Sequence, residues 1–253
     1  PHEPVAIHRH FGRAALADKL MAVQRAFAND PQVKRLWGDL FAAYGLDPAA
    51  TARDRLMLRF QPPVPLQGGP HRARSTATVG FHRDSWGTNL YAQVNWWAPL
   101  YPISAGRTFA FLPHLFDRPL ANDSAAFDLM EVMRHNRAAP ADADRKAMTP
   151  RPHEKVDMSM AVPVVIDPGD VIAFSAQHAH VGLPNHGDLT RISLETRTLR
   201  LADYRAGRGA PNVDGRARWI AFGMFRRVSD GAPLADLLGV EAFTPFAGAA
   251  GAG

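Results

Sequence analysis

Cysteine is absent from the sequence, and its absence excludes several kinds of chemistry. Disulfides, zinc–thiolate sites, iron–sulfur clusters and thiol nucleophiles all need this residue, so histidine and carboxylate side chains are the good metal ligands that remain. Long apolar runs are also absent: none approaches the roughly 20 residues of a membrane span, and the first residues, PHEPVAIHRHFGRA, have no signal-peptide core. These absences predict a cytoplasmic protein with no membrane partner.

Lysine is scarce, because only four of the 29 basic residues are lysines and the other 25 are arginines. The formal net charge is +5. A nucleic-acid-binding protein would concentrate that charge in a stripe with interleaved aromatic residues, whereas these arginines are scattered among acidic residues along the whole chain. We therefore expect no nucleic-acid partner, and a small anionic substrate is compatible with the positive surplus.

The composition, with 46% hydrophobic and 21% charged residues in a chain of 253, is that of a globular protein that needs no second core. We interpret residues 1–253 as a single domain. Apolar residues recur at helical spacing in 14–28 and 33–44, which predicts N-terminal helices within residues 13–45. Between them, Asp30 is a candidate N-cap and Pro31 suits a first helical turn.

Short segments rich in β-branched and aromatic residues, separated by glycine and proline, extend from Arg53 to about residue 226. These segments are DRLMLRF, TATVGFH, LYAQVNWWA, RTFAFLP, AVPVVI, DVIAFSA, TRISLETRTL and RWIAFGMF. They predict a mainly β core, a barrel or sandwich with flanking helices. The polar insertion 114–160, with a helix near 127–134, has the length of a lid or substrate loop, and the small-residue tail 246–253 is expected to be flexible.

The stretch GFHRDSWGTN, residues 80–89, contains a candidate pair of metal ligands, His82 and Asp84. Residues two apart on a strand face the same side, so at the end of TATVGFH the two side chains could reach one ion. The pattern alone is weak, because His186 and Asp188 repeat it in PNHGDLT. That second pair has the composition of a solvated turn, so the first pair is the better candidate.

A third ligand is expected from SAQHAHVGLPN, which places His178 and His180 just after the apolar segment DVIAFS. Their spacing again puts both imidazoles on one face, so either histidine could join the first pair. Two histidines and one carboxylate form the facial triad that holds ferrous iron and leaves three coordination positions open. The residue types therefore predict a metal site that does chemistry.

The segment TRISLETRTL alternates polar and mostly apolar residues, with Arg191 and Ser193 on the polar side. If this side faces the interior, Arg191 could bind a carboxylate through two hydrogen bonds and Ser193 could add a hydroxyl. The alternative is a strand whose polar side lies in water, which is common in antiparallel sheets.

The combination of His82-x-Asp84, PGDVIAFSAQHAHVGLPN and an arginine eleven residues after His180 resembles the phytanoyl-CoA dioxygenase type of iron(II)- and 2-oxoglutarate-dependent oxygenase. In that family the distal histidine opens a stretch like HVGLPN, so the resemblance selects His180 over His178. It implies that His82, Asp84 and His180 are the iron ligands. It also implies that Arg191, assisted by Ser193, binds the far carboxylate of 2-oxoglutarate.

A second stretch, NWWAPLYPISAGRTFAFLP, also resembles the family, although Pro113-His114-Leu115 departs from its usual P-G-S-H form. Gln93 and Asn95 share a strand face and could reach the 2-oxoglutarate. The resemblance implies a double-stranded β-helix (a jelly-roll, cupin-like barrel) that uses Fe(II), 2-oxoglutarate and O2. The implied reaction releases succinate and CO2 and hydroxylates an unactivated C–H bond. Related halogenases lack a carboxylate where Asp84 stands, so hydroxylation is favoured.

Two other functions stay open for the same residues: a non-oxidative cupin-like isomerase or lyase that uses the metal as a Lewis acid, and a small-molecule binding protein without turnover. Taken singly, His82 could cap a turn and Asp84 could pair with Arg83 or Arg107. A small-molecule substrate is expected, and a carboxylate on it would suit four arginines expected near the entrance, Arg72, Arg74, Arg83 and Arg107. Three tryptophans could wall the pocket or fill the core, namely Trp86, Trp96 and Trp97.

Overall fold

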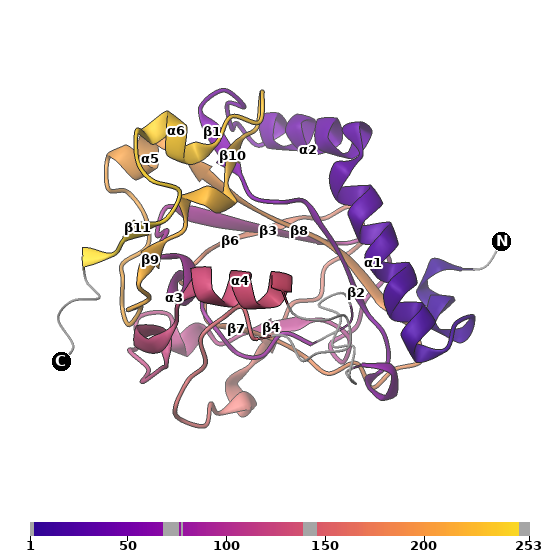
Figure 1. Cartoon of the computed structure of the whole chain (residues 1–253). Helices are drawn as coiled ribbons and strands as arrows, with labels where there is room; N and C mark the ends of the chain where they lie inside the picture. Colours follow the sequence, from indigo (N-terminus) through magenta and orange to yellow (C-terminus); the bar gives the residue numbers. More distant parts are fainter. Residues whose placement is uncertain (1–2, 68–75, 77, 139–145, 248–253) are drawn as a thin grey trace.

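The computed structural model describes residues 3–67, 76, 78–138 and 146–247 (Figure 1). The helices are α1 (Arg13–Asn29), α2 (Pro31–Ala43), α3 (Ser85–Thr88), α4 (Leu129–Ala138), α5 (Leu201–Arg205) and α6 (Leu234–Leu238). The strands are β1 (Thr51–Arg53), β2 (Met57–Gln61), β3 (Gln93–Pro99), β4 (Phe109–Phe111), β5 (Val162–Pro163), β6 (Ile172–Ser175), β7 (His180–Gly182), β8 (Arg191–Arg200), β9 (Trp219–Ile220), β10 (Arg226–Arg227) and β11 (Thr244–Pro245).

Two amphipathic helices open the fold, as the apolar spacing predicted. The boundary between α1 and α2 is fixed by Asp30, whose carboxylate accepts hydrogen bonds from the backbone N–H of Gln32 (2.7 Å) and Val33 (3.0 Å). Pro31 follows at the first helical position, where its missing N–H removes no intrahelical bond. The predicted N-cap is therefore confirmed.

The largest sheet has six antiparallel strands in the order β10-β1-β8-β3-β6, with β2 also paired to β8. A smaller sheet has the order β5-β4-β7, and β9 pairs with β11. Figure 1 shows β3 and β8 crossing the centre of the molecule, with α1 and α2 on one side and β4 and β7 on the other. The protein is mainly β with flanking helices, as predicted, and the described residues form no closed barrel.

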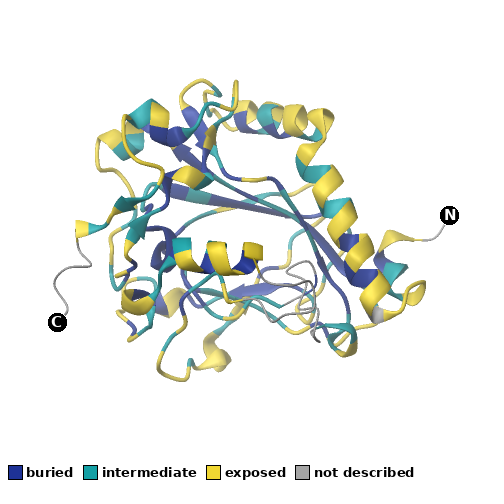
Figure 2. Cartoon of the chain, in the orientation of Figure 1, coloured by how far each residue is buried: buried dark blue, intermediate teal, exposed yellow. Residues whose placement is uncertain are grey.

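The two faces of the large sheet have different partners, because side chains alternate along each strand. On the helix side, Ile192 of β8 packs with Leu16 and Leu20 of α1, and Trp96 of β3 packs with Trp37 and Phe41 of α2. Figure 2 shows that the large sheet is mostly buried, whereas α1 and α2 expose their outer sides.

The opposite face of the large sheet carries polar side chains that are also buried. Arg191 is 6% exposed, and Ser193 and Gln93 are fully buried. The alternative of a strand whose polar side lies in water is therefore wrong. This polar layer lies inside the protein and is available to build a site.

One predicted strand, at residues 76–82, is not seen in the described part of that segment. In the described part of segment 76–82, the single bridge of His82 with His180 stands in place of a strand. Within residues 78–82, the backbone hydrogen bonds to β7 lie at Val79 and His82, and the chain then turns into α3. Contacts at two points do not make a continuous ladder. The residues on which the expected alternation of His82 and Asp84 depended thus have no regular pleat.

The insertion and the C-terminal tail are described in part. The helix predicted near 127–134 is α4, slightly later in the chain, and residues 139–145 lie outside the described ranges. In the tail, the N–H of Phe246 donates to the carbonyl oxygen of Arg218 (2.8 Å), and residues 248–253 are not described. No helix in the described ranges has the length and apolar character needed to cross a membrane.

Candidate metal centre

His82, Asp84 and His180 converge on one point between the two larger sheets. Each offers one ligand atom, and these atoms all lie within 4.8 Å of one another. Nε2 of His82 is 3.8 Å from Oδ1 of Asp84, and the two imidazole rings have centroids 4.3 Å apart. Among the described residues this is the group of histidine and acidic side chains that could hold a metal ion.

The two histidines are held together by their backbones. The N–H of each donates to the carbonyl oxygen of the other, both at 3.0 Å, which makes them directly opposite residues of an antiparallel bridge. The Nδ1–H groups of His82 and His180 donate to the carbonyl oxygens of Gly80 and His178, both at 2.9 Å. Nδ1 is thereby occupied and Nε2 is left as the ligand atom of both rings, as metal-binding histidines require.

Asp84 reaches the same point from a helix end rather than from a strand. It directly precedes α3 and has a helical backbone conformation. Its Oδ2 accepts a hydrogen bond from the side-chain amide of Asn95 (2.6 Å), whose Oδ1 accepts one from Gln93 (2.8 Å). The sequence therefore predicted the convergence of His82 and Asp84, but the reason it gave, a shared strand face, is wrong.

Burial and neighbouring charges favour the metal-binding protonation states of His82 and Asp84. Burial, together with the nearby His180, lowers the pKa of His82 to about 4, so the imidazole is neutral at neutral pH. Burial would raise the pKa of Asp84, but the neighbouring His180, His82 and Arg197 outweigh it and hold this pKa below its usual value. The carboxylate is ionised. Two imidazole nitrogen donors and one anionic oxygen donor suit Fe(II) better than calcium or magnesium.

The other candidate ligands lie outside the cluster. The ring of His178 has Nδ1 3.0 Å from Oγ of Ser175 and packs beside Phe116, with ring centroids 4.8 Å apart. Asp188, whose side chain is 85% exposed, forms an ion pair with Arg9. The structure thus brings His180 into the group and leaves out His178 and the pair His186 and Asp188.

Arg191 is a buried cation without a protein partner on two of its nitrogens. Its Nε and Nη1 have no hydrogen-bond partner, and neither does Oγ of Ser193 on the same strand face. Burial lowers the pKa of Arg191 to about 10, so the guanidinium keeps its charge at neutral pH. Buried polar groups are almost always paired, and a charged one costs most when it is not. This pair of side chains fits an incoming carboxylate.

Nearby arginines differ from Arg191, because each has a carboxylate partner. Arg59 donates to Glu195 (2.8 Å), and Arg197 binds Asp54 through Nε and Nη2. The Nη1 of Arg197 lies 3.7 Å from Oδ1 of Asp84. Neither Arg197 nor Asp54 was predicted from the sequence to lie at the site. The alternation of β8 carried a signal for Arg197, whereas nothing in the sequence marked Asp54.

Of the four arginines expected near the entrance, two are described, and their hydrogen bonds go to groups other than the candidate ligands. Arg83 is fully buried and pairs with Asp214, not with Asp84. Arg107 donates to the carbonyl oxygen of Pro102 (2.7 Å). Arg72 and Arg74 lie outside the described residues. The three tryptophans that could wall a pocket are all buried, Trp86, Trp96 and Trp97.

Gln93 and Asn95 have a partner that the sequence did not indicate. Their amides form a chain of hydrogen bonds that ends on the carboxylate of Asp84, while Oε1 of Gln93 has no partner. These contacts give both residues a part in orienting a candidate ligand. Their predicted reach to 2-oxoglutarate stays a prediction.

No protein-family model matches the sequence, and no curated protein matches it. Among solved structures, the chain is similar to EvdO2 from Micromonospora carbonacea var. aurantiaca complexed with 2-oxoglutarate, with 14% identity, a TM-score of 0.43, and coverage of 73% of this chain and 64% of that one. It is similar to ThoJ, a non-heme monooxygenase in its apo form, with 17% identity, a TM-score of 0.41, and coverage of 64% and 51%. SnoK, a non-heme alpha ketoglutarate dependent carbocyclase from nogalamycin biosynthesis, has 18% identity, a TM-score of 0.35, and coverage of 66% and 60%.

The chain spans less than two thirds of the length of each of these three structures. The likeness is partial and the identities are low. The geometry of this chain's own residues is therefore the basis for assigning a function to it.

Proposed function

We propose that this chain is an Fe(II)- and 2-oxoglutarate-dependent oxygenase that hydroxylates an unactivated C–H bond of a small molecule. The observation that carries the proposal is the convergence of His82, Asp84 and His180, with ligand atoms within 4.8 Å of one another. The buried guanidinium of Arg191, whose Nε and Nη1 have no hydrogen-bond partner, supports the choice of a dicarboxylate co-substrate.

The chemical character of the residues fits an iron ion. Three side chains supply two nitrogen donors and one oxygen donor, a set that leaves positions open for reactants. The bound ion would supply the redox chemistry by which O2 is used. In the overall reaction, 2-oxoglutarate loses CO2 and becomes succinate, which takes one oxygen atom of O2, and the other oxygen atom is inserted into the C–H bond.

The chain's own residues bind and orient the reactants. Arg191 and Ser193 would receive the far carboxylate of 2-oxoglutarate, because Nε, Nη1 and Oγ are donors that lack another partner. Asn95 holds Oδ2 of Asp84 and leaves Oδ1 toward His82. The burial of this layer excludes water and strengthens each electrostatic contact.

We further propose the phytanoyl-CoA dioxygenase type and its jelly-roll fold, in a single domain that covers residues 1–253. The order and spacing of the motifs support this subtype, and the antiparallel sheets on either side of the centre are compatible with the fold. Asp84 fills the place that halogenases leave free, which favours hydroxylation. We assign substrate specificity to the insertion 114–160, which contains α4.

The test is anaerobic addition of Fe(II) and 2-oxoglutarate to the full chain, followed by visible absorption. We expect a weak charge-transfer band in the wild type and in His186→Ala, which changes a histidine outside the centre. Asp84→Ala should abolish the band and, after O2 is admitted, succinate formation. Arg191→Ala should keep iron binding and raise the 2-oxoglutarate concentration that is needed.

The outcome also separates the alternatives. A non-oxidative metalloenzyme would bind the metal but give no band with 2-oxoglutarate, and a binding protein without turnover would release no succinate. Full succinate formation in Asp84→Ala would show that the proposed centre is not the one at work.

A further inference from the structure

We propose that Arg83 is a positioning residue for the metal centre, because its guanidinium fixes the turn between His82 and Asp84 to the backbone of residues 115–118, to Gln177 and to Asp214. The inference depends on the metal site proposed above. Arg83 lies between two candidate ligands in the sequence, but none of its hydrogen bonds goes to a candidate ligand atom.

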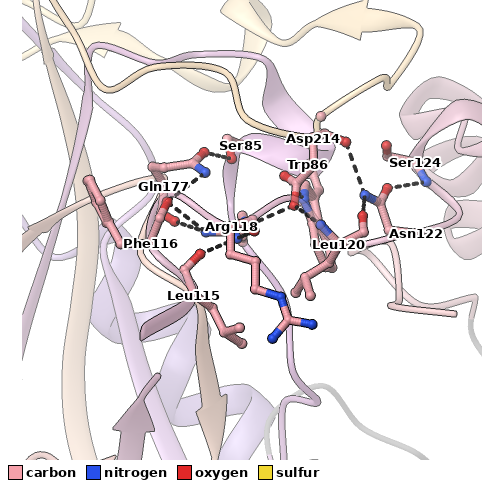
Figure 3. A network of polar contacts seen from close by, with 12 residues as sticks. Ser85, Trp86, Leu115, Phe116, Arg118, Leu120, Asn122, Ser124, Gln177 and Asp214 are labelled. Carbon is pink, nitrogen blue, oxygen red and sulfur yellow. Dashed lines mark hydrogen bonds and ion pairs between the residues drawn. The ribbon is translucent and has the colours of Figure 1, made fainter. Parts of the chain in front are cut away.

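Every N–H of Arg83 has an acceptor. A guanidinium has five N–H donors in a rigid, planar fork. The acceptors are Asp214 Oδ2 for Nε (3.2 Å), the carbonyl oxygens of Gln177 (2.7 Å) and Phe116 (3.3 Å) for Nη1, and those of Leu115 (2.5 Å) and Arg118 (2.9 Å) for Nη2. Figure 3 shows Leu115, Phe116 and Gln177 on one side of this network and Asp214, Leu120 and Asn122 on the other.

Burying the charged guanidinium of Arg83 carries a large desolvation cost. Arg83 is 0% exposed, and removing its charge from water costs about as much free energy as its pairing returns. An apolar side chain of similar volume would serve stability equally well. A specific requirement for five directed hydrogen bonds explains why a guanidinium stands here.

The hydrogen bonds of Arg83 and Ser85 hold together the two segments that supply the candidate ligands. Arg83 binds the carbonyl oxygen of Gln177, three residues before His180. Ser85, directly after Asp84, donates through Oγ to Oε1 of Gln177 (3.0 Å), and its N–H donates to the carbonyl oxygen of Ala176 (3.1 Å). These bonds set the separation of the segments next to the ligands. The spacing of the ligand atoms therefore depends on them.

Asp214 connects the same turn to a third part of the chain. Its carboxylate accepts hydrogen bonds from Arg83, from Nε1 of Trp86 in α3 (2.6 Å) and from the N–H of Leu120 (3.0 Å). Its carbonyl oxygen accepts one from Asn122 (3.0 Å). The turn that carries two candidate ligands is thus joined to the first part of the insertion 114–160. The beginning of the insertion, at Leu120 and Asn122, and the metal centre therefore keep a fixed relative position through Arg83 and Asp214.

The experiment compares the dissociation constant for Mn(II), measured by EPR titration of the full chain, in the wild type, Arg83→Lys and Leu234→Ala. Leu234 is a fully buried core residue in a cluster with Leu199 and Phe225, so Leu234→Ala is a control for lost stability. Lysine keeps the charge but cannot make five directed bonds. We expect Arg83→Lys to weaken Mn(II) binding about tenfold or more, whereas Leu234→Ala should leave the affinity within about twofold of wild type at a comparable loss of Tm.

Asp214→Asn is the second variant and decides the question if Arg83→Lys does not fold. It keeps the shape of the side chain and should also weaken Mn(II) binding. If the wild type binds Mn(II) and neither variant at these positions differs from Leu234→Ala, Arg83 is a stability residue only and the inference is overturned. If the wild type binds no Mn(II), the proposed function fails, and this inference fails with it.

Discussion

The side-chain amide of Asn95 is the donor that fixes the orientation of Asp84. Its Nδ2 lies 2.6 Å from Oδ2 of the carboxylate, and Gln93 holds the amide in turn. A residue that orients a metal ligand typically affects metal affinity about 10–100-fold. We expect Asn95→Ala to weaken Mn(II) binding by about this factor, measured by the same titration.

The matched control is Asn136→Ala in α4. Asn136 is also buried and its amide also donates to a fixed acceptor, the carbonyl oxygen of Lys146 (3.0 Å), but it lies outside the centre. It should lose stability and keep the affinity for Mn(II). Equal affinities in the two variants would mean that the amide of Asn95 has no part in holding the ligand.

The identity of the candidate ligands could be predicted from the sequence, but the residues that orient them could not. Histidine and aspartate are recognised by type, spacing and order, and the resemblance of HVGLPN selected His180. Strand β3 pairs with β8 in a register that places Asn95 opposite Arg197. Asn95 therefore donates a hydrogen bond to Asp84, and Arg197 lies near the same carboxylate. Strand register is a property of the assembled sheet, so a single segment of sequence does not contain it.

Strand β7 is the element that places His82, because the segment before His82 lies directly on it. The N–H of Gly182 donates to the carbonyl oxygen of Val79 (2.8 Å). A Cβ at Gly182 would meet that oxygen at 2.9 Å and Cγ2 of Thr78 at 3.1 Å. Glycine is therefore needed for this close approach of two backbones.

We expect Gly182→Ala to push the segment that carries His82 away from β7. The variant should lose about 1–3 kcal/mol of stability, as in other overpacked sites, and should bind Mn(II) more weakly because His82 moves relative to His180. Thermal unfolding and the titration measure the two effects. Gly106→Ala is the control, since nothing lies within 4 Å of its added Cβ. An unchanged Mn(II) affinity in Gly182→Ala would show that β7 does not set the position of His82.

Helices were easier to predict than the short strands. The apolar spacing and Asp30 define α1 and α2 within the N-terminal segment, because a helix is stabilised by local bonds and caps. Segment 76–82 has strand composition, yet the described part of it pairs with β7 only at isolated points. Composition indicates which segments suit a sheet. Composition does not indicate how many backbone hydrogen bonds the neighbouring strand can make with such a segment.

The molecule as a whole brings together ligands that are far apart in the chain. His82 and Asp84 precede β3, whereas His180 begins β7. Separate hydrophobic clusters hold the strands and helices of the fold together. The mainly β class and the flanking helices followed from local patterns. The partition into a six-stranded and a three-stranded sheet did not, because β8 pairs with three different strands along its length.

This assembly predicts that a bound metal stabilises the whole fold. The unfolded chain does not hold the two ligand segments together, so the metal binds the native state preferentially and adds about 2.7 kcal/mol at a free concentration of 100 times Kd. For a chain of 253 residues this corresponds to an increase in Tm of roughly 5–10 °C. Differential scanning calorimetry with and without Mn(II) measures it.

Two variants separate metal binding from general stability. Phe41→Ala removes a fully buried ring from the cluster under α2 and should cost about 3–5 kcal/mol, which lowers the starting Tm. Because that cluster lies on the other face of the large sheet, the increase caused by Mn(II) should persist. Asp84→Ala should remove the increase, since two imidazoles alone hold the ion weakly. An increase that survives in Asp84→Ala would place the stabilising metal elsewhere in the molecule.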